Sequence, residues 1–269
     1  MSNESWFGGV YQASITDGIT PFDQFSALHC ANITYLYTAV TAVLGFTPLK
    51  HEGKITGLAA YGKPKKACRA IFEQWLTKPE LISGLLRWDA MYDKHIAPSL
   101  MVNPTFRDAL KNSVAQFSRE DMAATVQEMA ELHVLDILEN IQQQGLSSKN
   151  ICLSGGLFAN VKINQRVSRF GFENIFIAPP MTDDGTALGA AWQVASKFSS
   201  FRPRRLKNMY LGPIASQSDS QSLINKLGVK YSSSNKSAKD IASRLALGAT
   251  VALFEGASEF GPRALGNRS

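Results

Sequence analysis

The sequence predicts an α/β protein, because two short apolar strands each run into a turn and then into a helix. The first strand, Asn150 to Leu153, stops at a glycine pair, and a helix-like stretch follows from Ala159. The second strand, Asn174 to Ala178, is broken by two prolines, and a helix of small residues then covers Gly185 to Phe198. Strands that alternate with helices are typical of an α/β sheet.

Upstream of these strands the sequence predicts two helices. Residues from Ala31 to Phe46 place apolar side chains at helical spacing. Ser118 fits an N-cap, and the apolar positions after it return every three or four residues until Gly145. Between the two helices, His51 to Pro64 has four glycine or proline breakers and indicates a loop with a short turn. Residues 72–119 show no pattern from which a register can be assigned.

Downstream, the charged stretch from Arg202 to Asn208 is the best candidate for a linker between domains, since it has almost no apolar residues. Beyond it, Ser216 to Leu227 and Ala238 to Leu247 show helical patterns. Thr250 to Phe254 is predicted to be a strand that leads into the glycine-rich end of the chain.

The composition is that of an ordinary globular protein, with 269 residues of which 45% are hydrophobic and 19% charged. No apolar run is long enough to cross a membrane, and the opening MSNESWFGG lacks the order of a secretory signal, so we expect a soluble cytoplasmic protein. The formal charge of +6 fits anionic small substrates such as phosphates as well as nucleic acid, because the excess is scattered.

Cys30, Cys68 and Cys152 are odd in number and far apart, which predicts three buried thiols and no disulfide framework. The sequence has no G-x-S-x-G, Walker A, H-E-x-x-H or C-x-x-C motif, so serine hydrolases, P-loop ATPases and zinc proteases are not supported. No second His or Cys lies at metal-binding spacing from His29, His95 or His133, and no role is assigned to them.

The first candidate site is LSGGLFANVKINQRV. Gly155 and Gly156 follow a strand and free backbone N–H groups to approach a phosphate at the start of a helix. The same joint also forms simply where a chain turns sharply. Asn160 and Asn164 lie four residues apart, so on a helix they share a face that could hydrogen-bond a nucleotide.

The second candidate site is PPMTDDGTALGAA, in which paired carboxylates precede a helix. Ligands gather at the carboxyl ends of strands in open α/β sheets, so Asp183 is the choice for a metal ligand. Alternatively, Asp184 or Thr182 only caps the helix.

The third candidate site is EGASEFGPRALGNRS. Arg263 and Arg268 lie among glycines, and their guanidinium groups match phosphate and carboxylate geometry, which favours an anion pocket over two idle surface arginines. In HEGKITGLAAYG, Lys54 could face a phosphate, with His51 and Glu52 as a polar pair near it. An ordinary solvated lysine is the competing interpretation.

Together these motifs resemble the nodulation-type and antibiotic-tailoring O-carbamoyltransferases, distant relatives of the tRNA threonylcarbamoyl transferase subunit. The resemblance rests on YLYTAVTAVLGF, HEGKITGLAAYG and the three candidate sites, in the family's order. It implies an actin-like, sugar-kinase-like (ribonuclease H-like) ATP-binding domain over residues 1–205. Residues 206–269 would then begin a smaller α/β domain similar to threonylcarbamoyl-adenylate synthases.

The resemblance also implies the chemistry. The smaller domain, with Arg263, Arg268 and Ser269, would bind carbamoyl phosphate and ATP, with Mg²⁺, and make a carbamoyl-adenylate. The larger domain would bind the adenylate through Gly155, Gly156 and Asn160, with Lys54 as a further phosphate contact, and pass the carbamoyl group to a hydroxyl of a small molecule.

Transfer in the family is expected near an Fe²⁺-type metal held by two histidines and an aspartate, and Asp183 corresponds to that aspartate. The family's H-x-x-x-H pair has no counterpart in this sequence, and the last motif stops at Ser269, so we expect a fragment of an enzyme, truncated at both ends. The alternatives are an actin-like small-molecule kinase and a non-catalytic nucleotide-binding scaffold. No nucleic-acid or membrane partner is expected, and a homo-oligomer is compatible with the sequence.

Overall fold

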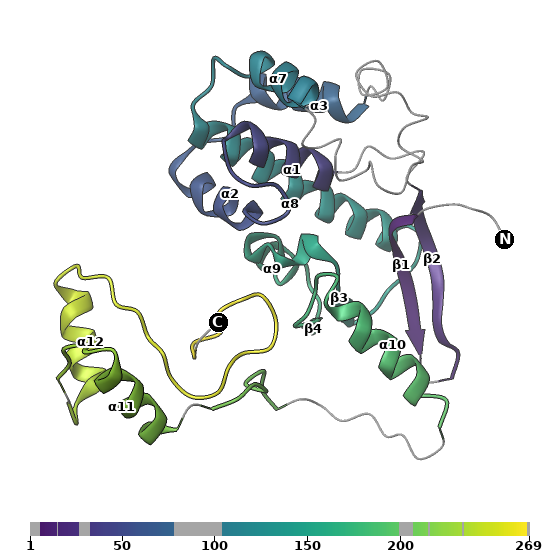
Figure 1. The fold of residues 1–269 in the computed structure, drawn as a ribbon. Coiled ribbons are helices and arrows are strands. Elements are labelled where there is room, and N and C mark those ends of the chain that lie inside the picture. Colours follow the sequence, from purple (N-terminus) through teal and green to yellow (C-terminus); the bar gives the residue numbers. More distant parts are fainter. Residues whose placement is uncertain are drawn as a thin grey trace. The chain divides into compact units, whose positions relative to one another are not determined.

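The computed structural model of the chain is a mixed α/β structure with two small sheets, which confirms the predicted class (Figure 1). The described residues are 6–14, 16–26, 33–77, 104–198, 207–214, 216–232 and 234–267. The chain divides into two compact units: Met1–Ile151 with Asn160–Asn174, and Cys152–Ala159 with Ile175–Ser269. The expected linker at 202–208 and the domain boundary after residue 205 fall largely or wholly outside the described residues.

The first unit begins with a β-hairpin that the sequence analysis did not predict. Strand β1 (Trp6–Ser14) pairs antiparallel with β2 (Gly18–Ser26), and Ser14 lies opposite Gly18 at the closed end. Asp17 fixes the turn, because its carboxylate accepts from the Ser14 hydroxyl (2.8 Å) and its own N–H donates to the same oxygen (2.8 Å). Gly18 has a φ of 72°, a conformation that glycine adopts readily. The Asp17-Gly18 pair is typical of hairpin turns and was the sequence signal from which this hairpin could have been predicted.

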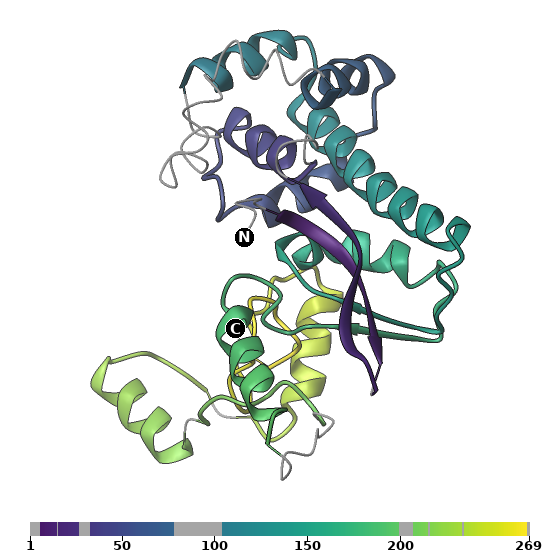
Figure 2. The same cartoon turned by 90° about the vertical axis from the view of Figure 1, so that its right-hand side faces the viewer.

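A group of helices around the long helix α8 forms the core of the first unit (Figure 2). These elements are α1 (Ile33–Val43), α2 (Glu52–Leu58), the 3₁₀ helix η1 (Ala59–Tyr61), α3 (Lys66–Thr77), α7 (Pro104–Ser113) and α8 (Arg119–Gln143). The fully buried large side chains include Val40, Ile55, Phe72, Leu110 and Val126. Burying each such side chain stabilises the fold by roughly 1.5–3 kcal/mol. Helices α1, α2 and α3 pack on α8, whereas α7 packs on α1.

The segment His51 to Pro64 is a short helix followed by a 3₁₀ turn, so the prediction of a loop was wrong for most of it. Its end lies against the first turn of α8, where Ser118 caps the helix as predicted by accepting from the Asp121 N–H (3.1 Å). The Lys63 N–H donates to the Asp121 carboxylate (2.8 Å). This contact with a distant segment could not be predicted from the glycines and proline between His51 and Pro64.

The predicted strand, turn and helix after α8 are confirmed. Strand β3 (Asn150–Leu153) is followed by the 3₁₀ helix η2 (Gly156–Ala159), by α9 (Val161–Val167) and by strand β4 (Asn174–Ile177). The Asn174 N–H donates to the Lys149 carbonyl (3.1 Å), and the Ala178 N–H to the Leu153 carbonyl (3.0 Å). Because the bonds advance in the same direction along both strands, β3 and β4 run parallel.

The second unit contains α10 (Gly185–Ala195), α11 (Gln217–Lys226) and α12 (Ser237–Ala246), which confirms three predicted helices. The predicted strand at 250–254 is wrong, since these residues join no ladder. An apolar run becomes a strand only when a neighbour pairs with its backbone. In this part of the chain the structure describes only an isolated bridge, between Ile214 and Ala257, outside the named strands.

The cysteines divide between buried and exposed positions. Cys68 is buried, as predicted, but Cys152 in β3 is exposed, and the prediction of a buried thiol was wrong there. Cys30 lies outside the described residues. None of the helices in the described ranges is both long enough and apolar enough to span a membrane.

Candidate functional site

Asn160 is the N-cap of α9 and lies directly after the glycine turn in the sequence. Its Oδ1 accepts from the N–H groups of Lys162 (3.1 Å) and Ile163 (3.3 Å), and only 8% of the residue is exposed. The side chain therefore completes the N-terminal end of the helix.

The Asn160 amide also pairs with the amide of Gln127 on α8. Asn160 Nδ2 donates to Gln127 Oε1 (2.8 Å), and Gln127 Nε2 donates back to Asn160 Oδ1 (3.2 Å). Gln127 is itself only 5% exposed. Two reciprocal bonds between buried amides hold both side-chain planes in one orientation, because rotating either would leave buried polar atoms without partners.

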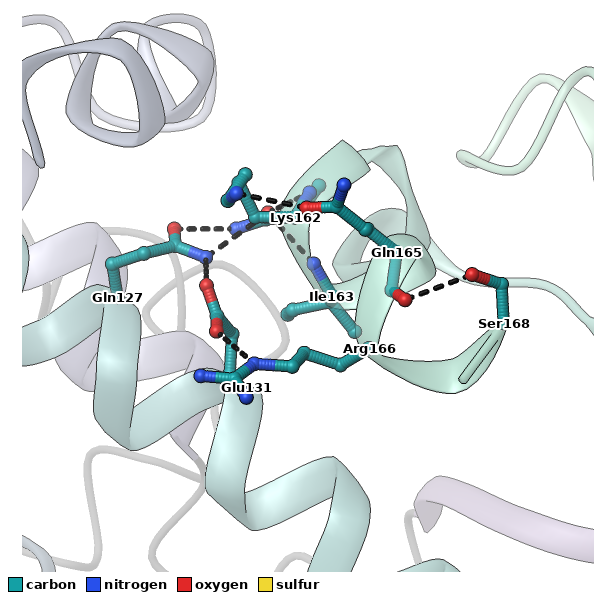
Figure 3. Close-up of polar contacts among 8 residues, drawn as sticks. Gln127, Glu131, Lys162, Ile163, Gln165, Arg166 and Ser168 are labelled. Carbon is teal, nitrogen blue, oxygen red and sulfur yellow. Dashed lines mark hydrogen bonds and ion pairs between the residues drawn. The ribbon is translucent and has the colours of Figure 1, made fainter. Parts of the chain in front are cut away.

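The polar contacts continue from Gln127 to Glu131 on α8 and from there to Arg166 on α9 (Figure 3). Gln127 Nε2 donates to Glu131 Oε1 (2.8 Å), and Arg166 Nε donates to Glu131 Oε2 (2.8 Å). The side chain of Glu131 is 8% exposed and that of Arg166 50% exposed. The buried carboxylate thus has both an amide donor and a counter-charge, which buried charges require.

Tyr37 on α1 closes the other side of this cluster. Its hydroxyl donates to Gln127 Oε1 (2.8 Å) and lies 2.9 Å from the Thr56 hydroxyl of α2. Burial raises the pKa of Tyr37 to about 12, so the hydroxyl keeps its proton and stays a donor at physiological pH. We call Tyr37, Gln127, Glu131, Asn160 and Arg166 the amide cluster; all five belong to the first unit.

The glycine turn itself lies in the second unit. Gly155 has a φ of 108°, and a Cβ added at Gly155 or Gly156 would meet no atom within 4 Å. The Gly155 N–H donates to the Met181 carbonyl (2.8 Å), two residues before Asp183. The structure therefore brings the glycine turn and the Asp183 segment side by side.

Asp183 is exposed, one residue before the N-cap of α10. Asp184 occupies the N-cap position, yet its side chain makes no capping hydrogen bond. Within the described ranges no three His, Cys, Asp or Glu side chains come together as a metal site. Asp183 and Asp184 alone do not fit a complete iron centre.

Arg263 lies at the glycine turn as well, because one of its terminal nitrogens donates to the carbonyl of Ala159. Its loop is fixed by Glu259, whose Oε1 accepts from the N–H groups of Leu265 (2.7 Å) and Asn267 (2.8 Å). Arg263 Nε is buried and has no protein partner among the described residues. Arg268 and Ser269 lie outside the described residues.

Lys54 is exposed on α2, with its Nζ 5.6 Å from the centroid of the Phe46 ring. The Arg119 guanidinium lies 5.4 Å from the same centroid and donates to the Leu44 carbonyl (2.8 Å). The described contact of Lys54 is thus a cation–π contact.

A small apolar pocket of about 150 Å³ opens beside the glycine turn in the second unit. Its lining includes Ser154, Phe176, Pro179, Leu188, Trp192 and Phe260. A cavity of this size and character accommodates a small ring. The pocket, the glycine turn and Arg263 are parts of one unit.

The sequence analysis did not select Gln127, Glu131 or Tyr37. A signal was present, since Gln127 and Glu131 lie four residues apart among the apolar positions of α8, where two polar side chains must find buried partners. Their partners come from segments distant in sequence, which spacing alone does not identify.

Comparison with known proteins places these motifs in a family. A family model described as the carbamoyltransferase N-terminus matches residues 5–192, more than two thirds of the chain. The chain is 34% identical to the uncharacterized protein MJ1058 of Methanocaldococcus jannaschii over 247 residues, which cover 89% of the chain and 39% of that protein.

Two nodulation proteins are similar to the same extent. The chain is 34% identical to nodulation protein NolNO of Sinorhizobium fredii, over 87% of the chain and 34% of the relative. It is also 34% identical to nodulation protein NolO of Bradyrhizobium diazoefficiens, over 81% of the chain and 39% of the relative. The chain spans about two fifths or less of the length of these relatives. The matches confirm the resemblance inferred from the motifs, and the chain belongs to the carbamoyltransferase family.

Proposed function

We propose that the chain is part of an ATP-dependent O-carbamoyltransferase, which transfers the carbamoyl group of carbamoyl phosphate, through a carbamoyl-adenylate, to a hydroxyl of a small molecule. The observation that carries this proposal is the family match over residues 5–192. The proposed fold is the actin-like ATP-binding domain, followed by the beginning of an adenylate-forming domain. The proposed protein acts in the cytoplasm, needs no nucleic acid or membrane, and is compatible with a homo-oligomer.

The Asn160 amide is held by protein partners. Oδ1 accepts from two backbone N–H groups and from Gln127, and the amide nitrogen donates to Gln127 Oε1 and also hydrogen-bonds Tyr37. The adenylate contact proposed for Asn160 therefore rests on the resemblance of its motif to the family, and the hydrogen bonds hold the residue in place after the glycine turn.

The glycine turn and Arg263 support an anionic ligand in the second unit. Neither Gly155 nor Gly156 has a side chain to block an approaching phosphate, and their surroundings are open. Arg263 Nε is a buried donor without a protein partner among the described residues. A guanidinium at this place would offset the negative charge of a phosphate or mixed anhydride.

The transfer step needs an activated acyl group and an acceptor. In the proposed reaction, the hydroxyl oxygen bonds to the carbamoyl carbon, the bond from that carbon to the AMP oxygen breaks, and the hydroxyl loses its proton. AMP leaves as a phosphate monoester, a much better leaving group than hydroxide. The residues of this chain would bind and orient the adenylate, which lowers the entropic part of the barrier.

The proposal is tested by incubating the whole protein with Mg²⁺-ATP, carbamoyl phosphate and a panel of hydroxyl compounds, and following AMP and carbamoylated product. We expect AMP to form only when carbamoyl phosphate is present. A phosphorylated acceptor formed without carbamoyl phosphate would show a kinase instead. Binding of ATP with no turnover on any acceptor would favour a scaffold.

Two variants separate the half-reactions. Asp183→Ala is expected to abolish transfer but to leave carbamoyl-adenylate formation intact, whereas Arg263→Ala is expected to impair adenylate formation. In the first half-reaction ATP, carbamoyl phosphate and water give carbamoyl-adenylate, pyrophosphate and phosphate, so exchange of labelled pyrophosphate into ATP measures this half-reaction alone. Loss of both half-reactions in Asp183→Ala would contradict this division.

A further inference from the structure

We infer that Glu259 is a positioning residue, which holds the loop of residues 261–267 closed so that the Arg263 guanidinium stays at the glycine turn. The inference rests on the proposed function, because it deepens the role of Arg263 in adenylate formation. Glu259 acts through the backbone of the loop and contacts no reacting atom. All the residues concerned belong to the second unit.

One oxygen of the Glu259 carboxylate closes the loop. Oε1 accepts from the N–H groups of Leu265 (2.7 Å) and Asn267 (2.8 Å), which lie six and eight residues further along the chain. Hydrogen bonds to a charged acceptor are stronger than those between neutral groups. Arg263 lies between Glu259 and these two residues in the sequence, so the two bonds close the stretch of chain that carries it.

The returning part of the loop has further partners. The Tyr210 hydroxyl donates to the Leu265 carbonyl (3.0 Å), and Asn267 Nδ2 donates to the Ala257 carbonyl (3.1 Å). Leu265 is therefore held through its N–H by Glu259 and through its carbonyl by Tyr210. These contacts fix the backbone two residues after Arg263.

The outgoing part of the loop lies against two other backbone segments. The Phe260 N–H donates to the Met209 carbonyl (2.8 Å). Gly261 has a φ of 108°, and a Cβ there would lie 2.4 Å from the Pro179 carbonyl oxygen, so the chain passes directly against the segment after β4. Glu259 is next to these fixed residues, and its side chain joins them to the far end of the loop.

The loop needs such a contact because it contains glycines. Gly261 and Gly266 have φ values of 108° and 107°, and glycine has more backbone conformations available than any other residue. Without Glu259 Oε1, the two backbone N–H groups would bond to water and the loop would open more often. Arg263 would then leave the Ala159 carbonyl in a larger fraction of molecules, which lowers the population competent to bind an anion.

The first test needs no enzymatic activity. Trypsin cleavage after Arg263 is followed by mass spectrometry on the full chain, and its rate reports the population of the open loop. Glu259→Ala is expected to speed this cleavage about tenfold, because two hydrogen bonds to a partly exposed carboxylate are lost. Glu255→Ala is the matched control, since it removes the same charge from an exposed side chain four residues earlier, and it should stay within about twofold of wild type.

Glu259→Gln separates the acceptor from the charge. Backbone N–H groups can only donate, so the glutamine oxygen must take the place of Oε1 and the amide nitrogen that of Oε2. Oε2 is buried and accepts no hydrogen bond from the described residues, so this exchange breaks none of the loop's described contacts. We expect the cleavage rate of Glu259→Gln to stay within about threefold of wild type.

The second test measures kcat/KM for the carbamoyl-phosphate-dependent exchange of pyrophosphate into ATP by the whole protein. Glu259→Ala should lower it about tenfold, and Glu259→Gln by less than about threefold. In the Arg263→Lys background the loss from Glu259→Ala should shrink to less than about twofold, because an ammonium on a flexible stem depends less on where the backbone lies.

Equal cleavage rates of Glu259→Ala and wild type would overturn the inference, as would an equal loss of exchange with and without Arg263→Lys. It would also be overturned if Glu259→Gln were as impaired as Glu259→Ala, since the charge and not the acceptor would then matter. Tyr210→Phe removes the bond to the Leu265 carbonyl without changing a charge, and provides a second variant should Glu259→Ala not fold. It should speed cleavage about threefold, and an unchanged rate would contradict a loop closed by these bonds. Absence of exchange in wild type would refute the proposed function, whereas the cleavage rates would still decide whether Glu259 holds Arg263 in place.

Discussion

Gly62→Ala should destabilise the protein, because the segment that ends α2 and η1 lies against the backbone of α8. A Cβ at Gly62 would lie 2.0 Å from the carbonyl oxygen of Glu120 and 2.7 Å from the N–H nitrogen of Asp121. Side-chain carbons do not approach backbone atoms this closely, so the two segments must separate by about 1 Å. Neither backbone can yield as a flexible side chain would.

The separation affects two hydrogen bonds at once. The Lys63 N–H donates to the Asp121 carboxylate at 2.8 Å, and the Lys65 N–H donates to the buried Thr125 hydroxyl at 3.0 Å. The bond to Asp121 is exposed and water can replace it, so the cost comes from the buried Thr125 hydroxyl and the steric contact, about 1–3 kcal/mol of destabilisation. The loss should appear as a lower urea midpoint with an unchanged m-value.

Gly57→Ala is the matched control, since Gly57 belongs to α2 and a Cβ there meets nothing within 4 Å. Alanine is the better helix former, so this variant should be stabilised by up to about 1 kcal/mol. Unfolding free energies within about 1 kcal/mol of each other for Gly62→Ala and wild type would refute the reasoning from the α8 contact.

Three further predictions concern ionisable groups. The hydrogen bond from the Lys63 N–H, and then the Lys65 ammonium, lower the pKa of Asp121 below its ordinary 3.8. The ionised carboxylate should therefore stabilise the folded protein above pH 3.8, and this stabilisation should be lost as the pH falls through the pKa of Asp121 in the folded state. Asp121→Asn should therefore flatten the acid limb of a stability curve from pH 2 to 5, and an unchanged limb would speak against the contact. Burial lowers the pKa of His133 and the charge of Asp136 partly offsets this, so NMR titration should give a value below 6.5 that falls further in Asp136→Asn. Burial raises the pKa of the Cys68 thiol to about 11, so peptide-resolved alkylation at pH 8 should modify exposed Cys152 but spare Cys68, and equal rates would contradict the burial.

The sequence by itself determined the local elements and the family. Helical spacing and the Ser118 cap predicted α8, and the strand and glycine signals predicted β3 and β4, since these features depend on neighbours within a few residues. The order of five motifs was sufficient for the resemblance, which the family match confirms. The same local reasoning failed at 250–254, because a strand needs a partner that composition does not supply.

Only the tertiary structure decided what the site residues touch. The sequence analysis selected Asn160 for its place after a glycine turn. In the structure its amide donates to Gln127, 33 residues earlier in the chain. Gln127 in turn accepts a hydrogen bond from the Tyr37 hydroxyl, a further 90 residues back. Arg263 reaches the carbonyl of Ala159 across 104 residues. A buried donor or acceptor must be matched wherever the fold brings a partner within about 3 Å, and that proximity is a property of packing and not of spacing along the chain.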